Sequence, residues 1–140
     1  MKLRHIGIVV NDLNNSLKFW KNNFSLKIIK SVKEQGETID QMLGYKNCKI
    51  KTVKMTNKSG LSLELIEFLK PKRIKKEIKT NYNGITHFAL EVKNLDEFYK
   101  KNKKKIKFNC SPQISKDKKV KVLYAKTPEN SFIELVQKLK

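Results

Sequence analysis

Two histidines and two glutamates recur in matching contexts, and their side chains are those of metal ligands. His5 and His87 are the only histidines, and each is third in a similar stretch, LRHIGIVVNDL or ITHFALEVKNL. Glu64 and Glu134 align likewise, each followed by leucine, in GLSLELIEF and NSFIELVQK. If the two halves pair symmetrically, two imidazoles and two carboxylates converge, and a divalent cation balances their two negative charges.

The alternative interpretation is a pair of His–Glu hydrogen bonds without a metal. A lone histidine in an apolar strand is usually a hydrogen-bonded core residue. A carboxylate in such a strand is rarer, because burying an unpaired charge costs several kcal/mol. The repetition of both residue types therefore favours a metal site. Nitrogen and oxygen ligands suit Zn, Ni, Co, Mn or Fe, and the composition does not choose among them.

Each half has the pattern of a strand, a helix and further strands. Alternating apolar residues predict strands over residues 3–10 and 85–92. Apolar residues at helical spacing follow the first of these, and the helix caps are Asn11 or Asp12 in one half and Asn94 or Asp96 in the other. Further strand-like runs are residues 26–32, 49–55 and 61–68, then Phe108, 120–125 and 131–136.

Strand alternation separates a core face from a site face. Ile6, Ile8 and Val10 share the face expected to pack under the helix, whereas His5 shares the other face with the small residue Gly7. In the last strand of each half, the glutamate points away from its two flanking apolar residues. The four candidate ligands are therefore expected on the faces that the core leaves open.

The organisation is that of one domain, residues 1–140, built from two modules. The first module is 1–69, the second is 84–140, and the polar linker 70–83 between them could hold one helical turn. The His–Glu spacing is 59 residues in the first half and 47 in the second, so the first half has about twelve extra residues within 31–49. The segment 34–44 has a short helical pattern and is expected to form a lid or an extra turn over a cleft.

The composition limits which classes of binding partner and which cellular compartment we expect. The net charge of +19 makes an anionic partner plausible, but only Arg4 and Arg73 are arginines, and nucleic-acid readout favours arginine. Specific nucleic-acid binding is therefore the weaker alternative to a solvated lysine surface. No apolar stretch is long enough to cross a membrane. Cys48 and Cys110 form no metal-binding or redox spacing, so we expect reduced thiols and a cytoplasmic protein.

The motifs HIGIVVNDL, THFALEVKNL, SLELIEF and TPENSFIELV resemble the vicinal oxygen chelate superfamily of glyoxalase I, methylmalonyl-CoA epimerase, extradiol dioxygenases and drug-resistance proteins. The resemblance covers essentially the whole chain. It implies an α+β fold in which two βαβββ modules form a half-open barrel around a divalent metal. His5, Glu64, His87 and Glu134 fall on the four ligand positions of the family, and this set is similar to that of bacterial glyoxalase I.

The resemblance implies a lyase or isomerase that abstracts a proton next to a carbonyl, through a metal-stabilised enediolate. Glu134 would be both ligand and base, and the partner acid would be Glu64, Glu37 or Asp40. Val9 stands where bacterial glyoxalase I has an arginine for glutathione, so the expectation widens to an epimerase-like enzyme. The expected substrates are an acyl-CoA, a thiol hemithioacetal, or a phosphorylated or nucleotide-linked sugar. A homodimer is a further expectation. The alternative function is that of a non-catalytic binding or drug-resistance protein of the same fold.

Overall fold

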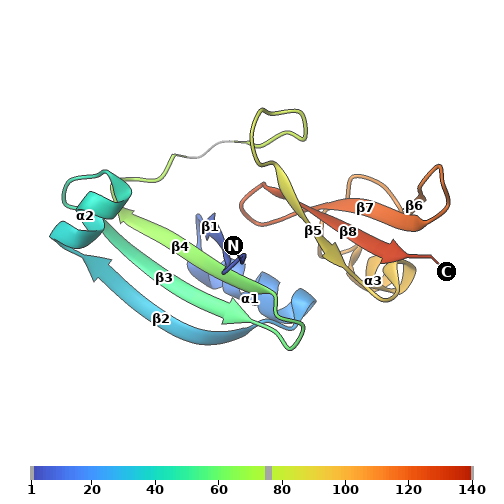
Figure 1. Cartoon of the computed structure of the whole chain (residues 1–140), viewed down its shortest axis with the longest axis horizontal. Coiled ribbons are helices and arrows are strands. Elements are labelled where there is room, and N and C mark those ends of the chain that lie inside the picture. The colour runs from blue at the N-terminus through green and yellow to red at the C-terminus, as the bar shows by residue number, and fades with distance from the viewer. Residues whose placement is uncertain (1, 75–76, 140) are drawn as a thin grey trace. The chain divides into compact units, whose positions relative to one another are not determined.

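A computed structural model describes residues 2–74 and 77–139 of the chain. The described residues group into two compact units that divide between residues 75 and 76. The elements of the first unit are β1 (Ile6–Val9), α1 (Leu13–Phe24), β2 (Lys27–Gln35), α2 (Glu37–Leu43), β3 (Lys49–Thr56) and β4 (Ser62–Lys70). Those of the second are β5 (His87–Glu91), α3 (Leu95–Asn102), β6 (Gln113–Ile114), β7 (Val120–Lys126) and β8 (Phe132–Lys138) (Figure 1). The predicted α+β class with two βαβββ modules is confirmed.

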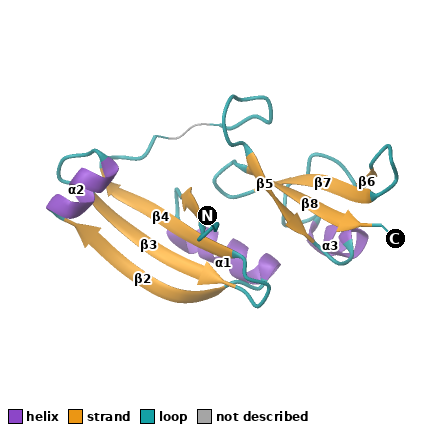
Figure 2. Cartoon of the chain, viewed as in Figure 1, coloured by secondary structure: helices purple, strands orange, loops and turns teal. Residues whose placement is uncertain are grey.

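The two units share one sheet topology. The first sheet has the order β1-β4-β3-β2, and the second has the corresponding order β5-β8-β7-β6 (Figure 2). In each sheet the first strand runs parallel to the last, and the other pairs are antiparallel. Gly7 lies opposite Glu64, and Ala89 lies opposite Glu134 in the same parallel register. The sequence repeat is therefore also a repeat of strand pairing.

The core of each unit lies between its sheet and its long helix. In the first unit, α1 contacts β4, and Trp20, Leu63 and Leu65 are fully buried. In the second, α3 contacts β8, and Ile133 and Leu135 are fully buried. Both helices begin after a predicted cap. The Asp12 carboxylate accepts from the backbone N–H of Asn15, and the Asn94 side chain accepts from that of Glu97.

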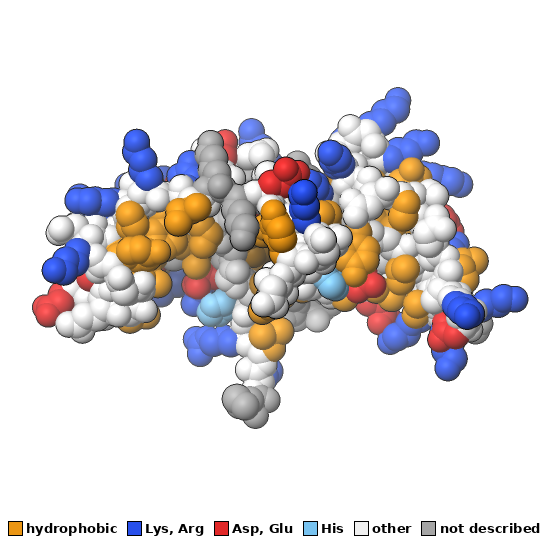
Figure 3. Space-filling view, turned by 90° about the horizontal axis from the view of Figure 1, so that it is seen from above, with side chains coloured by type: hydrophobic (Ala, Val, Ile, Leu, Met, Phe, Trp, Pro, Cys, Tyr) orange, Lys and Arg blue, Asp and Glu red, His pale blue; other side chains and the backbone are white. Residues whose placement is uncertain are grey.

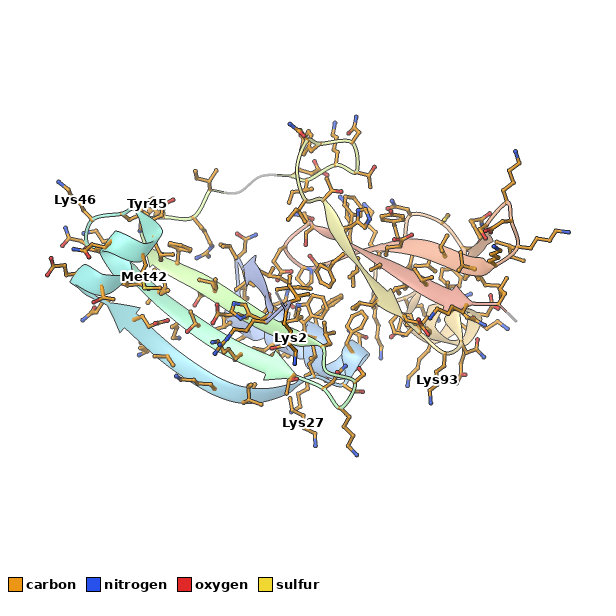
Figure 4. The ribbon with its side chains drawn as sticks, viewed as in Figure 1. Lys2, Lys27, Met42, Tyr45, Lys46 and Lys93 are labelled. Carbon is orange, nitrogen blue, oxygen red and sulfur yellow. The ribbon has the colours of Figure 1, made fainter. Side chains whose placement is uncertain are left out.

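The extra segment of the first unit forms α2, which confirms the predicted short helix. Its residue Ile39 packs in an apolar cluster with Cys48 and Ile50, and Ile66 and Phe68 pack against the same cluster. Ile66 and Phe68 alternate with the core residues of β4, so α2 covers part of the face opposite α1. Met42 of α2 and Tyr45 after it are labelled in Figure 4, and both are exposed.

Several predicted elements differ from the observed ones. β1 starts at Ile6, so His5 stands just before the strand. Phe108 forms an isolated bridge with Ala125, and its ring packs against Tyr99 of α3 with centroids 5.2 Å apart. The observed edge strand is β6, which the sequence did not predict. The described parts of the connection, 71–74 and 77–86, contain no helix or strand. Residues 75 and 76 of the predicted linker lie outside the described residues.

Candidate functional site

The first His–Glu pair lies on the first sheet, on the face opposite α1. His5 precedes β1 and Glu64 belongs to β4, and His5 Nε2 lies 3.2 Å from Glu64 Oε2. The other carboxylate oxygen, Oε1, lies 3.4 Å from Lys54 Nζ. The Glu64 side chain is 18% exposed, so solvent screens these contacts only in part. Glu64 therefore bridges an imidazole and an ammonium group.

The second pair repeats this placement with a different neighbour. His87 Nε2 lies 3.8 Å from Glu134 Oε2 on the second sheet. Tyr124 Oη lies 3.2 Å from the same Nε2 atom, and Thr86 Oγ1 lies 3.1 Å from His87 Nδ1. Both contacts are satisfied when His87 Nδ1–H donates to Thr86 and the Tyr124 hydroxyl donates to Nε2. In that tautomer, Nε2 carries the lone pair that a metal would bind.

The protonation of Tyr124 agrees with this tautomer. Burial, followed by the negative charge of nearby Glu134, raises the pKa of the Tyr124 phenol above its ordinary value. The phenol therefore keeps its proton and acts as a donor toward His87. The aromatic rings of Tyr124 and His87 also meet edge to face, with centroids 5.0 Å apart.

The residues fit a divalent cation in their donor chemistry. Each pair presents an imidazole nitrogen and a carboxylate oxygen within 4.0 Å of each other, and the Nδ1 contact of His87 is the outer-shell support that metal-bound histidines usually have. Among the described residues, no group of three or more His, Cys, Asp or Glu is gathered. The structure thus brings the four predicted ligands together as two pairs, one in each unit.

Lys54 and Tyr124 are site residues that the sequence interpretation missed. In the antiparallel pairing of β3 with β4, Lys54 lies directly opposite Glu64, and in that of β7 with β8, Tyr124 lies directly opposite Glu134. Each precedes its glutamate by ten residues. Extending the repeat alignment backward through the hairpin would have found both.

The other two predicted acid/base candidates have local roles. The carboxylate of Asp40 accepts from the backbone N–H groups of Asn47 and Cys48, at 2.7 and 2.6 Å. Asp40 thus stabilises the turn between α2 and β3. Glu37 is exposed and accepts from Gln41 on the next turn of α2 at 3.2 Å. Both carboxylates therefore have the capping or solvent-facing roles typical of a helix.

A small pocket opens beside the first pair, on the same face of the sheet. Its lining comes from three adjacent strands: Lys30, Val32, Glu34, Thr52, Lys54 and Glu64. The hydroxyl of Thr52 donates to Glu34 Oε2 at 3.0 Å. The pocket lining therefore contains two lysines and two glutamates, and one of the glutamates is a candidate metal ligand.

The charge of +19 is otherwise spread over the surface. Figure 3 shows lysine and arginine side chains scattered over the face in view. Lys27 at the start of β2 and Lys93 after β5 are exposed to solvent (Figure 4). No helix within the described ranges is long and apolar enough to span a membrane. Cys48 is buried and Cys110 is exposed, and the two are not paired with each other.

Comparison with known proteins supports the same family. The family model described as Glyoxalase/Bleomycin resistance protein/Dioxygenase superfamily matches residues 4–124. No curated protein sequence matches the chain. A glyoxalase family protein from Bacillus cereus has a similar fold, with a TM-score of 0.86, 20% identity and coverage of 100% of this chain and 95% of that chain.

Two further solved structures have the same fold at lower similarity. The fosfomycin resistance protein FosX from Listeria monocytogenes has a TM-score of 0.68 at 20% identity, covering 99% of this chain and 94% of that chain. The trypanothione-dependent glyoxalase I of Leishmania major has a TM-score of 0.68 at 19% identity, covering 98% and 86%. Together with the match over residues 4–124, these findings show that the chain belongs to the glyoxalase/bleomycin resistance protein/dioxygenase superfamily.

Proposed function

We propose that this protein is a divalent-metal-dependent lyase or isomerase that removes a proton next to a carbonyl group. The observation that supports it is the His–Glu pair on the open sheet face of each unit, with Nε2 directed at a carboxylate oxygen. His5, Glu64, His87 and Glu134 would hold the metal, which would be Zn, Ni, Co or Mn.

The chain's own residues have distinct roles in such a reaction. A bound divalent cation would supply Lewis acidity at a substrate oxygen. Glu134 is the base that accepts the proton from carbon, and its counterpart Glu64 returns a proton. Lys54 holds the Glu64 carboxylate in place, and Thr86 holds the ring of His87. Asp40 is disfavoured as the partner acid, because two backbone N–H groups already occupy its carboxylate.

The net charge of the whole chain supports the choice of substrate class. The positive charge of the protein favours an anionic substrate, and we propose a lactoylglutathione lyase-like or methylmalonyl-CoA epimerase-like reaction. Acyl-CoA, hemithioacetal and phosphorylated or nucleotide-linked sugar substrates all fit that description. A homodimer is also proposed, since pairing of two chains is common among enzymes of this fold.

Metal content measured by elemental analysis tests the proposal. The protein would be purified without a histidine tag, beside a His5→Ala/His87→Ala double variant, which removes every histidine of the chain. We expect about one transition metal per wild-type chain and none in the variant. Exchange of the α-proton in D₂O would then be screened over the three substrate classes.

The proposal would be contradicted by a wild-type protein that contains no metal and is not stabilised against thermal unfolding by added Ni, Co, Zn or Mn. That result would support the alternative, a protein of this fold that binds a small molecule or a drug without chemistry.

A further inference from the structure

Two lysines lie side by side in the lining of the pocket on the first sheet. Lys30 of β2 and Lys54 of β3 are direct cross-strand partners, and both line the pocket. Like charges directly opposite on neighbouring strands destabilise a sheet. An anion bound between them would relieve this repulsion, and solvent can reach both side chains, since Lys30 is exposed and the Lys54 side chain is 31% exposed.

The carboxylates already present relieve this repulsion only in part. Lys54 contacts Glu64, but its ammonium group has three N–H donors and a single carboxylate oxygen at 3.4 Å. Lys30 forms no ion pair with any residue in 2–74 or 77–139. The third charged neighbour, Glu34, already accepts from the Thr52 hydroxyl. The two ammonium groups therefore have more N–H donors than the carboxylates of the pocket accept.

We propose that Lys30 and Lys54 form a subsite for an anionic group of the substrate, of the size of a carboxylate or a phosphate. The identity of that substrate rests on the proposed function, but the anion subsite does not. Val32 forms the apolar part of the lining, and Thr52 and Glu34 border the subsite on the α2 side. When Glu64 engages a cation, Lys54 becomes free to turn toward the anion.

The same strands carry a matched control on their other face. Lys33 and Lys51 are also direct cross-strand partners, and they alternate with Val32 and Thr52, so they point away from the pocket. Glu67 lies opposite Lys51 on β4, as Glu64 lies opposite Lys54. Replacing Lys33 thus removes the same charge from the same strand without touching the pocket.

The test is a titration of inorganic phosphate and of acetate into the full-length, metal-free protein at constant ionic strength. Backbone amide shifts in NMR report the site, and we expect saturable shifts at residues 30–34, 52–54 and 64. Lys30→Gln and Lys54→Gln should each weaken binding by about tenfold, since hydrogen bonds to charged groups are lost. Lys33→Gln should change it by less than about twofold. Glu64→Gln should strengthen binding severalfold, because it releases Lys54.

Each outcome separates the subsite from the proposed function. Tighter binding of phosphate or of acetate assigns the anionic group, and either supports the proposal. Equal weakening by Lys33→Gln and Lys30→Gln would mean nonspecific attraction and would overturn it, as would shifts that do not saturate. A protein that binds the anion but no metal keeps the subsite and loses the proposed function, whereas one that binds metal but no anion does the reverse.

Discussion

Lys54 and Tyr124 occupy equivalent positions in the two units, each directly opposite a candidate ligand glutamate on the neighbouring antiparallel strand. Their contacts nevertheless differ. The Lys54 ammonium lies against the Glu64 carboxylate, whereas the Tyr124 hydroxyl lies against the imidazole of His87. The first unit therefore offsets the charge of its glutamate, and the second leaves Glu134 beside a neutral phenol. The two glutamates of the repeat therefore differ in the side chain that lies opposite them.

Replacing Tyr124 by Phe should strengthen metal binding. The phenol donates to His87 Nε2, so a metal must break that hydrogen bond before it can use the nitrogen. Its removal should lower the dissociation constant of the metal by about fivefold, and should cost the metal-free protein about 1 kcal/mol of unfolding free energy. Competition with a chromogenic chelator measures the first quantity. Weaker metal binding in Tyr124→Phe would count against His87 Nε2 as a ligand.

Replacing Thr86 by Ala should weaken metal binding at the imidazole of His87. Thr86 holds Nδ1, and loss of such an outer-shell partner typically weakens metal binding by about 10-fold or more. Thr86→Ser keeps the hydroxyl and should retain the wild-type affinity. The same chelator competition distinguishes the two variants, and equal losses in both would show that the methyl group, not the hydrogen bond, matters.

Glu134→Gln should abolish proton exchange without unfolding the protein. The substitution preserves shape and removes the charge of the proposed base, so the rate of α-proton exchange should fall by at least about 100-fold. Glu91→Gln is the control, since Glu91 is the last residue of β5 and forms its ion pair with the exposed Lys138. Thermal unfolding checks the fold of both variants. Unchanged exchange in Glu134→Gln would sink the assignment of the base.

The helix caps should stabilise the two units by similar amounts. Asp12→Ala and Asn94→Ala each remove a side-chain acceptor from the first turn of a helix, and each should lower the free energy of unfolding by about 1 kcal/mol. Urea denaturation followed by circular dichroism measures the change. Asn14→Ala, on the exposed surface of α1, should alter stability by less than about 0.5 kcal/mol.

The two thiols should differ sharply in reactivity. Burial, with a smaller contribution from Asp40, raises the pKa of the Cys48 thiol above its ordinary value of 9.0. A disulfide-exchange reagent at pH 8 should therefore label one thiol of the native chain rapidly. Cys110→Ser should remove that fast phase, and rapid labelling that persists in Cys110→Ser would contradict the burial of Cys48.

The shifted pKa of Cys48 also has a consequence for stability. A folded-state pKa above the unfolded one means that the native thiol keeps its proton where the unfolded thiol loses it. The contribution to stability is therefore complete below about pH 9 and falls as the pH rises through the raised value. Cys48→Ala should show a shallower loss of stability over that range than the wild type.

Much of the fold could be predicted from local patterns. The repeat of His5 and His87, and of Glu64 and Glu134, indicated two modules, because equivalent residues need equivalent strands to carry them. Period-two alternation placed the glutamates on the faces away from the core, and the ion pairs agree with that placement. The edge strand was placed wrongly at Phe108, because β6 pairs with β7 over only two residues, which is too short to leave an alternating pattern in the sequence.

The sequence by itself determined the family, the two-module plan and the four candidate ligands, since these depend on periodicity and on residue types in matching contexts. Only the tertiary structure decided that Lys54 and Tyr124 stand beside those ligands, and that Lys30 and Lys54 lie side by side in the lining of a pocket. Cross-strand neighbours depend on register, and register is set by hairpin length and by bulges such as that between Ile28 and Lys30. Hydrogen bonds such as that of Thr86 depend further on side-chain rotamers, which packing selects only in the folded chain.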